Sequence, residues 1–255
     1  MTYIIAEIGI NHNGDMDLAK KLIKNASESN CNAVKFQKRT INEVYTKEEL
    51  DKFRESPWGT TNREQKEGLE FNIEQYKELE AYSISEGLDF IVSCWDLQSI
   101  DDIENNLNVK YHKVASALAT DMMTVDEINS AVNILDNVEY ILACTSTYPT
   151  KADEVNLKHI QTLKSKYNQK IGFSNHYNGL DACVGATALG AECIEFHITI
   201  DRTMYGSDQP ASIENVKSMV TAIRTMEKMV GDGVKVVYET EKPIASKLRK
   251  INNIT

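Results

Sequence analysis

The sequence predicts an α/β fold in which a parallel β-sheet curls into a TIM-type (β/α) barrel with seven clear strands. Short apolar runs rich in β-branched residues alternate with longer segments of helical period. These runs are apolar on both faces, which is typical of a parallel sheet covered by helices. A chain of 255 residues, 42% of them hydrophobic, is long enough to form one large core. We therefore expect a single barrel domain over residues 1–255.

The expected strands and helices alternate along the chain. The seven apolar runs are 3–10, 33–38, 89–95, 111–116, 140–146, 170–175 and 193–199. Apolar stripes at helical spacing lie between them, and the clearest two are Leu18, Leu22, Ile23 and Ala26, and Ile73, Tyr76, Leu79 and Tyr82. The segment 40–71 is long for a connection, so it predicts an elaborated loop over the mouth of the barrel. Its charged run 47–51 favours a solvated helix face over a lid.

Composition excludes several classes of partner. The net charge of −10 argues against nucleic acid or an anionic membrane, because both are bound by an excess of Lys and Arg. The five cysteines have no CxxC spacing, and their odd number suits a reducing compartment, so we expect most of them to be small core residues. The chain shows neither a signal-peptide pattern nor an apolar stretch of membrane length, and we expect a soluble, cytoplasmic protein.

Polar and charged residues stand near the end of almost every expected strand. Side chains two positions apart share one face of a strand, so Lys35 and Gln37 point to the same side, as do Glu195 and His197. Such residues at the C-terminal ends of barrel strands indicate an active site, whereas at the opposite end they would indicate stability. The set comprises Glu7, Lys35, Gln37, Ser93, Lys113, Ser116, Ser146, Ser174, His176, Glu195 and His197.

Two kinds of chemistry are suggested by this set, each with a simpler alternative. His176 and His197 close neighbouring strands and could hold a divalent cation, with Glu195 or Asp208 and a water as further ligands; Mn²⁺ suits such mixed donors. Alternatively, each imidazole is satisfied by a backbone carbonyl. Lysines and serine hydroxyls in one cavity suit a phosphate or carboxylate. The alternative is that Lys35 and Lys113 pair only with the glutamates.

Several segments together resemble the sialic acid synthase family. They are IIAEIGINHNG (4–14), AVKFQK (33–38), HKVAS (112–116), CTSTYPT (144–150), the stretch 171–212 that ends in DRTMYGSDQPAS, and GDGVK (231–235). The resemblance implies a metal-dependent transferase that condenses phosphoenolpyruvate with N-acetylmannosamine or a related aldose, giving a sialic-acid-like nonulosonic acid and phosphate. A legionaminic or pseudaminic acid precursor is an alternative acceptor. A homodimer is a further expectation.

The resemblance also implies roles for individual residues. His176 and His197 match the family positions that bind Mn²⁺ or Mg²⁺. Phosphoenolpyruvate is expected to contact Lys35, Ser93, Lys113, Ser116, Ser174 and Ser146, the last of which often is asparagine in the family. The acceptor sugar is expected to contact Glu7, Gln37, Tyr148 and Asp208. We assign catalytic roles to Glu7, Lys113 and His197.

Two departures from the family pattern stand beside these expectations. Between HKVAS and MMTVDEINSAV, roughly twenty residues of the family pattern are expected to be absent, which corresponds to one strand–helix unit. Seven strands would then have to close the barrel, although strand number, shear and tilt are linked in a barrel. The family's C-terminal antifreeze-like domain, which reaches a partner subunit, is also expected to be absent. These departures motivate an alternative function, a degenerate paralogue that binds ligand or a full-length synthase without turnover.

Overall fold

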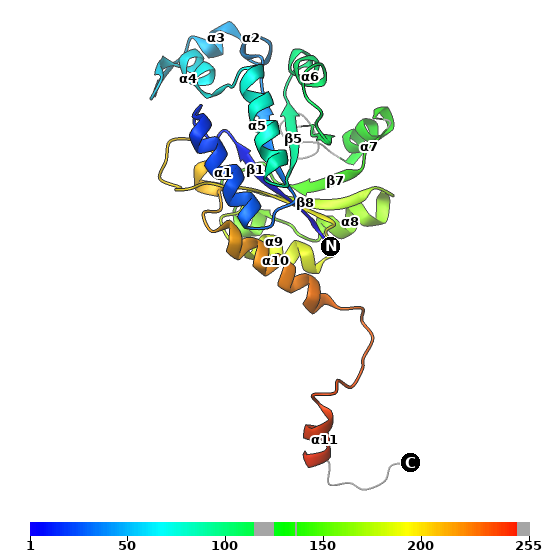
Figure 1. Cartoon of the computed structure of the whole chain (residues 1–255). Helices are drawn as coiled ribbons and strands as arrows, with labels where there is room; N and C mark the ends of the chain where they lie inside the picture. The colour runs from blue at the N-terminus through cyan, green and yellow to red at the C-terminus, as the bar shows by residue number, and fades with distance from the viewer. Residues whose placement is uncertain (115–124, 136, 249–255) are drawn as a thin grey trace.

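Seven parallel strands form one curled sheet in the computed structural model, which describes residues 1–114, 125–135 and 137–248 (Figure 1). The strand order is β6-β5-β2-β1-β9-β8-β7. The strands are β1 (Tyr3–Gly9), β2 (Ala33–Lys38), β5 (Asp89–Cys94), β6 (Tyr111–His112), β7 (Tyr140–Cys144), β8 (Lys170–Asn175) and β9 (Cys193–His197). All seven predicted runs therefore form strands, and the α/β barrel-type fold is confirmed as a curled half-barrel. The prediction for the fourth run was too long, because β6 has only two residues.

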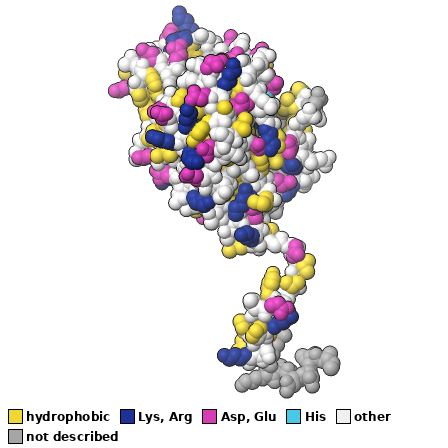
Figure 2. Space-filling view, in the orientation of Figure 1, with side chains coloured by type: hydrophobic (Ala, Val, Ile, Leu, Met, Phe, Trp, Pro, Cys, Tyr) yellow, Lys and Arg dark blue, Asp and Glu magenta, His cyan; other side chains and the backbone are white. Residues whose placement is uncertain are grey.

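Helices alternate with the strands and pack around the outside of the sheet (Figure 1). They are α1 (Met16–Glu28), α5 (Ile73–Ser85), α6 (Leu97–Glu104), α7 (Val125–Ile134), α8 (His159–Lys166), α9 (Asp181–Ala188) and α10 (Val216–Val230). Both predicted apolar stripes fall on helices, on α1 and α5. A last helix, α11 (Lys242–Leu248), lies away from the barrel at the end of an extended segment (Figure 1 and Figure 2). In the described part of the chain, no helix combines the length and apolarity needed to cross a membrane.

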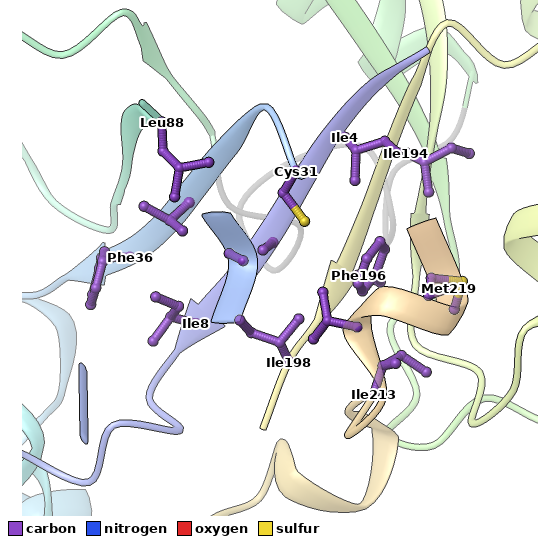
Figure 3. Close-up of a cluster of buried hydrophobic side chains, with 14 of the residues drawn as sticks. Ile4, Ile8, Cys31, Phe36, Leu88, Ile194, Phe196, Ile198, Ile213 and Met219 are labelled. Atoms are coloured by element: carbon purple, nitrogen blue, oxygen red, sulfur yellow. The ribbon is translucent and has the colours of Figure 1, made fainter. Parts of the chain in front are cut away.

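The hydrophobic core lies between the outer face of the sheet and its helices. Alternate residues of β1, such as Ile4 and Ile8, face outward and pack beside Phe196 of β9 and Met219 of α10 (Figure 3). All four side chains are fully buried. Because burying a large aliphatic side chain contributes about 1.5–3 kcal/mol, this layer anchors the strands at the centre of the sheet. Four of the five cysteines are buried and all five are free, as expected for core residues.

The long connection between β2 and β5 is built from short elements. They are α2 (Ile41–Val44), α3 (Lys47–Leu50), the hairpin β3 (Phe53–Ser56) and β4 (Gly59–Thr61), and α4 (Asn62–Leu69). Capping boxes start α3 at Thr46 and α4 at Thr61, which supply acceptors for N–H groups that lack helical partners. Only Leu50 of α3 is buried, so the charged run is a solvated helix face, as predicted.

Three tyrosines fill the floor of the half-barrel at the N-terminal ends of the strands. Tyr3, Tyr111 and Tyr140 stand on β1, β6 and β7, with ring centroids 6.0–6.2 Å apart. Strands β6 and β7 are the two edges of the sheet, and no backbone pairing joins them within the described ranges. The edges are therefore linked across the floor by aromatic contacts. The predicted region of the missing unit, residues 115–124, lies outside the described residues.

Truncating the floor should cost stability. We expect Tyr140→Ala to lower the free energy of unfolding by about 2–4 kcal/mol, because both aromatic partners lose a ring contact and a cavity opens. Urea titration followed by circular dichroism measures the loss. Tyr238→Ala, in the exposed segment before α11, is the matched control and should change stability by less than about 0.5 kcal/mol. Equal losses in the two variants would show that the floor does not link the edges.

Candidate active site

The C-terminal ends of the strands open into one cavity of about 330 Å³. Eleven predicted site residues line it: Glu7, Lys35, Gln37, Ser93, Lys113, Ser146, Tyr148, His176, Glu195, His197 and Asp208. Ser174 reaches the same group through a hydrogen bond to Glu195, and Ser116 lies outside the described residues. Strand register explains the convergence, because Glu7 of β1 is level with Lys35 of β2 on one side and with His197 of β9 on the other.

Charges of alternating sign cross the mouth, and all of them are buried except the partly exposed Lys113. Lys35 Nζ lies 2.8 Å from Glu7 Oε2 and 3.7 Å from Glu195 Oε2. Lys113 Nζ lies 3.2 Å from Glu195 Oε1, which also accepts a hydrogen bond from Ser174 Oγ at 2.9 Å. Burial opposes ionisation of Glu195, but Lys113 and Lys35 outweigh it and hold the pKa of this carboxyl below its usual range. The pairing of both lysines with the glutamates is thus confirmed, and anion binding by them stays a prediction.

The histidine pair lies beside this row of charges. The ring centroids of His176 and His197 are 5.4 Å apart. His176 Nδ1 lies 2.8 Å from the carbonyl oxygen of Thr145, which can only accept, so Nδ1 carries the proton and Nε2 the lone pair. The Tyr148 hydroxyl donates to Nε2 at 2.8 Å. Burial, and then His197, lower the pKa of His176 to about 3, so its imidazole is neutral at physiological pH.

His197 and Asp208 meet without a hydrogen bond. Asp208 Oδ2 lies 3.7 Å from His197 Nδ1, which is buried and has no hydrogen-bond partner among the described residues. Gly9 allows this convergence: a Cβ there would lie 3.1–3.4 Å from the side chains of Glu7, Gln37 and Asp208, and its φ of +53° favours glycine. Glu195, predicted as a possible metal ligand, forms ion pairs with Lys35 and Lys113, and its part in metal binding stays a prediction. Within the described ranges, no three His, Cys, Asp or Glu side chains gather as a ready-made metal site.

The sequence prediction missed the outer end of the cavity, which is lined by Arg39, Tyr45, Lys66, Glu70 and Trp95. The guanidinium of Arg39 stacks on the Trp95 ring at 4.2 Å. Burial, and then Arg39 and Arg54, lower the pKa of Lys66 to about 8. A signal for two of these residues was present, because Arg39 and Trp95 each stand two positions beyond a predicted site residue, Gln37 and Ser93.

Fold and site together define an α/β-barrel enzyme whose active site is built at the C-terminal ends of the strands. Comparison with known proteins gives the family. A sequence model described as the NeuB family matches residues 22–122 and 117–235, and the chain belongs to this family.

Named relatives and a solved structure agree with this assignment. The chain is 35% identical to an N,N'-diacetyllegionaminic acid synthase of Campylobacter jejuni, covering 98% of this chain and 83% of the relative. It is 33% identical to the human N-acetylneuraminate-9-phosphate synthase, covering 97% and 76%. A sialic acid synthetase of Leptospira borgpetersenii, crystallised with citrate, superposes with a TM-score of 0.81 at 28% identity, covering 98% and 93%. The prediction of an enzyme of the synthase class is confirmed.

The comparisons also bear on the expected gap. The alignment with the Campylobacter relative spans 282 positions although this chain has 255 residues, so the relative carries residues with no counterpart here. The two matches to the family overlap at 117–122, the place where the sequence predicts the missing unit.

A buried histidine in the loop after β1 gives a pH-dependent prediction. The His12 ring stacks on Phe71 with centroids 4.2 Å apart, and burial lowers the pKa of His12 from 6.5 to about 3. The unfolded chain therefore binds one more proton between pH 6.5 and 3. As far as His12 is concerned, the free energy of unfolding is at its full value above pH 6.5. It decreases as pH falls toward 3, by up to about 1.4 kcal/mol per pH unit.

His12→Gln removes this proton uptake. Urea unfolding at several pH values should give a shallower decline of stability between pH 6 and pH 4 in the variant than in the parent chain, by about one proton. Any packing cost of the substitution is the same at every pH, so the slope alone reports the histidine. Identical slopes would contradict the assigned shift.

Proposed function

We propose that the protein condenses phosphoenolpyruvate with an N-acyl aldose, N-acetylmannosamine or a close relative, to give a nonulosonic acid and phosphate. The observation that carries the proposal is one cavity in which two lysines share a buried carboxylate beside a histidine pair. The relatives support it, because their names describe synthases of N-acetylneuraminate 9-phosphate and diacetyllegionaminic acid. The acceptor is the part of the proposal on which these relatives differ.

The lysine side of the cavity suits phosphoenolpyruvate. Lys35 lies between Glu7 and Glu195, and Lys113 lies beside Glu195, so an entering phosphate or carboxylate would meet two ammonium groups on this side of the cavity. The Ser93 hydroxyl donates to the carbonyl of Lys113 at 3.1 Å, which ties the short β6 to β5. Ser146 lines the same cavity.

The other side suits the acceptor. Glu7, Gln37, Tyr148 and Asp208 line the wall and present carboxylate, amide and phenol groups, the donors and acceptors that sugar hydroxyls require. Gly9 lets three of these side chains approach one another. In the reaction, C3 of phosphoenolpyruvate attacks the aldehyde carbon, and the aldehyde oxygen takes a proton to become a hydroxyl. Water adds at C2 and loses a proton, and the resulting tetrahedral carbon expels phosphate while its hydroxyl proton is released, which leaves a ketone. Glu7, level with His197 across the strands, would take the proton of that water, and Lys113 would stabilise the departing phosphate.

A divalent cation, Mn²⁺ or Mg²⁺, is part of the proposal. The donor set fits: His176 offers the Nε2 lone pair of a fixed tautomer, and His197 Nδ1 is a buried nitrogen without a hydrogen bond, near the Asp208 carboxylate. Tyr148 would have to release Nε2. When bound, the cation would polarise a carbonyl oxygen as a Lewis acid.

A second candidate is binding of ligand, or of a full-length synthase, without turnover. The division of the family match into two parts that overlap at 117–122 favours it, because the unit expected to be missing there closely follows Lys113 in the sequence. Phosphate release separates the two candidates. With phosphoenolpyruvate, Mn²⁺ and a panel of N-acyl aldoses, we expect release only when an aldehyde acceptor is present. Bound phosphoenolpyruvate with no release for any aldose would support the second candidate.

Lys35→Met should weaken phosphoenolpyruvate binding far more than aldose binding. Loss of a buried charged partner predicts roughly a 100-fold rise in the Kd for phosphoenolpyruvate by calorimetry. Lys77→Met, an exposed lysine of α5, is the matched control. Lys35→Arg keeps the charge between the two glutamates and guards against a folding defect. A larger effect on the aldose would mean that the two halves of the cavity are assigned the wrong way round.

His176→Ala and His197→Ala should each abolish stabilisation by Mn²⁺. A cation that binds only the folded state at 100 times its Kd adds about 2.7 kcal/mol, which thermal unfolding detects without any turnover. His159→Ala, on helix α8, is the control and should keep the shift. A full shift in either cavity variant would reject a shared site.

A further inference from the structure

A guanidinium stands behind the acceptor wall of the cavity. Arg39 directly follows β2 and donates through Nη2 to Gln37 Oε1. Gln37 Nε2 in turn donates to Glu7 Oε1 at 2.7 Å. Arg39, Gln37 and Glu7 thus form a hydrogen-bonded chain from the outer end of the cavity to the row of buried charges.

The two ends of this chain fix the orientation of the amide between them. A carboxylate accepts only and a guanidinium donates only, so Gln37 must turn its NH₂ to Glu7 and its oxygen to Arg39. The flipped amide would set oxygen against carboxylate and NH₂ against guanidinium. Electrostatics therefore decide the orientation, and the remaining N–H and lone pair of Gln37 have fixed directions.

Arg39 is itself held from three sides. Its guanidinium stacks on Trp95 at 4.2 Å, and Nη1 lies 3.4 Å from Glu70 Oε1. Its backbone N–H donates to Glu70 Oε2 at 3.2 Å. The Arg39 and Glu70 side chains are only 10% and 13% exposed. A lysine could not stack and also reach both Gln37 and Glu70, because its single ammonium lacks the planar fork.

We propose that Arg39 is a positioning residue for the acceptor, which acts by locking the amide of Gln37. This inference rests on the proposed function for the identity of the acceptor, an N-acyl aldose. Trp95 and Glu70 hold the guanidinium, the guanidinium holds the amide, and the amide presents one donor and one acceptor to a hydroxyl or N-acyl group of the sugar. The hydrogen-bonded chain gives a selective prediction: a change at Arg39 should weaken binding of the acceptor more than binding of phosphoenolpyruvate.

The first test is a double-mutant cycle on the full chain with N-acetylmannosamine and phosphoenolpyruvate. We expect Arg39→Lys to raise the KM for the aldose at least about tenfold and the KM for phosphoenolpyruvate less than about threefold. The double variant Gln37→Ala/Arg39→Lys should be no worse than Gln37→Ala alone, because both changes remove one interaction. Additive losses, or equal effects on the two substrates, would overturn the proposal. Arg63→Lys, on the exposed side of α4, is the control.

The second test needs no turnover and stands even when the proposed function fails. NMR reports hydrogen exchange of the Gln37 side-chain amide, identified by its absence in Gln37→Ala. We expect exchange at least about tenfold faster in Arg39→Lys. Because loss of Arg39 leaves Glu70 buried without its cation, Arg39→Met/Glu70→Gln is the second variant, and faster exchange is expected there too. Unchanged exchange in folded variants would refute the positioning role, whereas absent phosphate release with faster exchange would refute only the proposed reaction.

Discussion

The row of charges Glu7–Lys35–Glu195–Lys113, buried except for the partly exposed Lys113, is the constraint on which the rest of the site depends. An unpaired charge in the interior costs several kcal/mol, so each member is tolerable only beside its neighbours. The row crosses from β1 to β2 and β9 and reaches the residue after β6. A register slip of one residue would turn these side chains toward the apolar core outside the sheet. The interaction that permits the site therefore also specifies the pairing of the strands.

The two ends of the half-barrel solve different problems. At the mouth, charged side chains and imidazoles are held in place by burial and pairing. This arrangement contributes little net stability. At the floor, Tyr3, Tyr111 and Tyr140 bring together strands that have no backbone ladder between them among the described residues. Stability at one end thus supports a polar arrangement at the other, as in barrels whose catalytic face is separate from their stabilising face.

The fold and the inner site could be predicted from the sequence because both follow from the period of a strand. In a run such as 33–38, apolar side chains point outward to the core and the last polar side chains point inward to the cavity. Lys35 and Gln37 lie on the inner face, where this alternation places them. The outer end could not be predicted fully, because Lys66 reaches the cavity from a loop helix whose position depends on tertiary packing. Glu195 shows a second limit, because its ion pairs with two lysines could be established only from the distances in the structure.

The place where the two family matches meet lies closer in the sequence to some cavity residues than to others. Glu7, Gln37, His176 and His197 stand on or directly after β1, β2, β8 and β9, which are continuous neighbours in the sheet. The two family matches overlap at 117–122, which lies in the sequence between β6 and β7, the two edge strands. Lys113 and Ser146, like Tyr148, follow those edge strands, whereas Glu7, Gln37 and Arg39 stand on or directly after the central strands β1 and β2. A change at the edge strands would therefore reach Lys113 and Ser146 first, whereas Glu7 and Gln37 stand on central strands whose register is fixed by pairs such as Glu7 with Lys35.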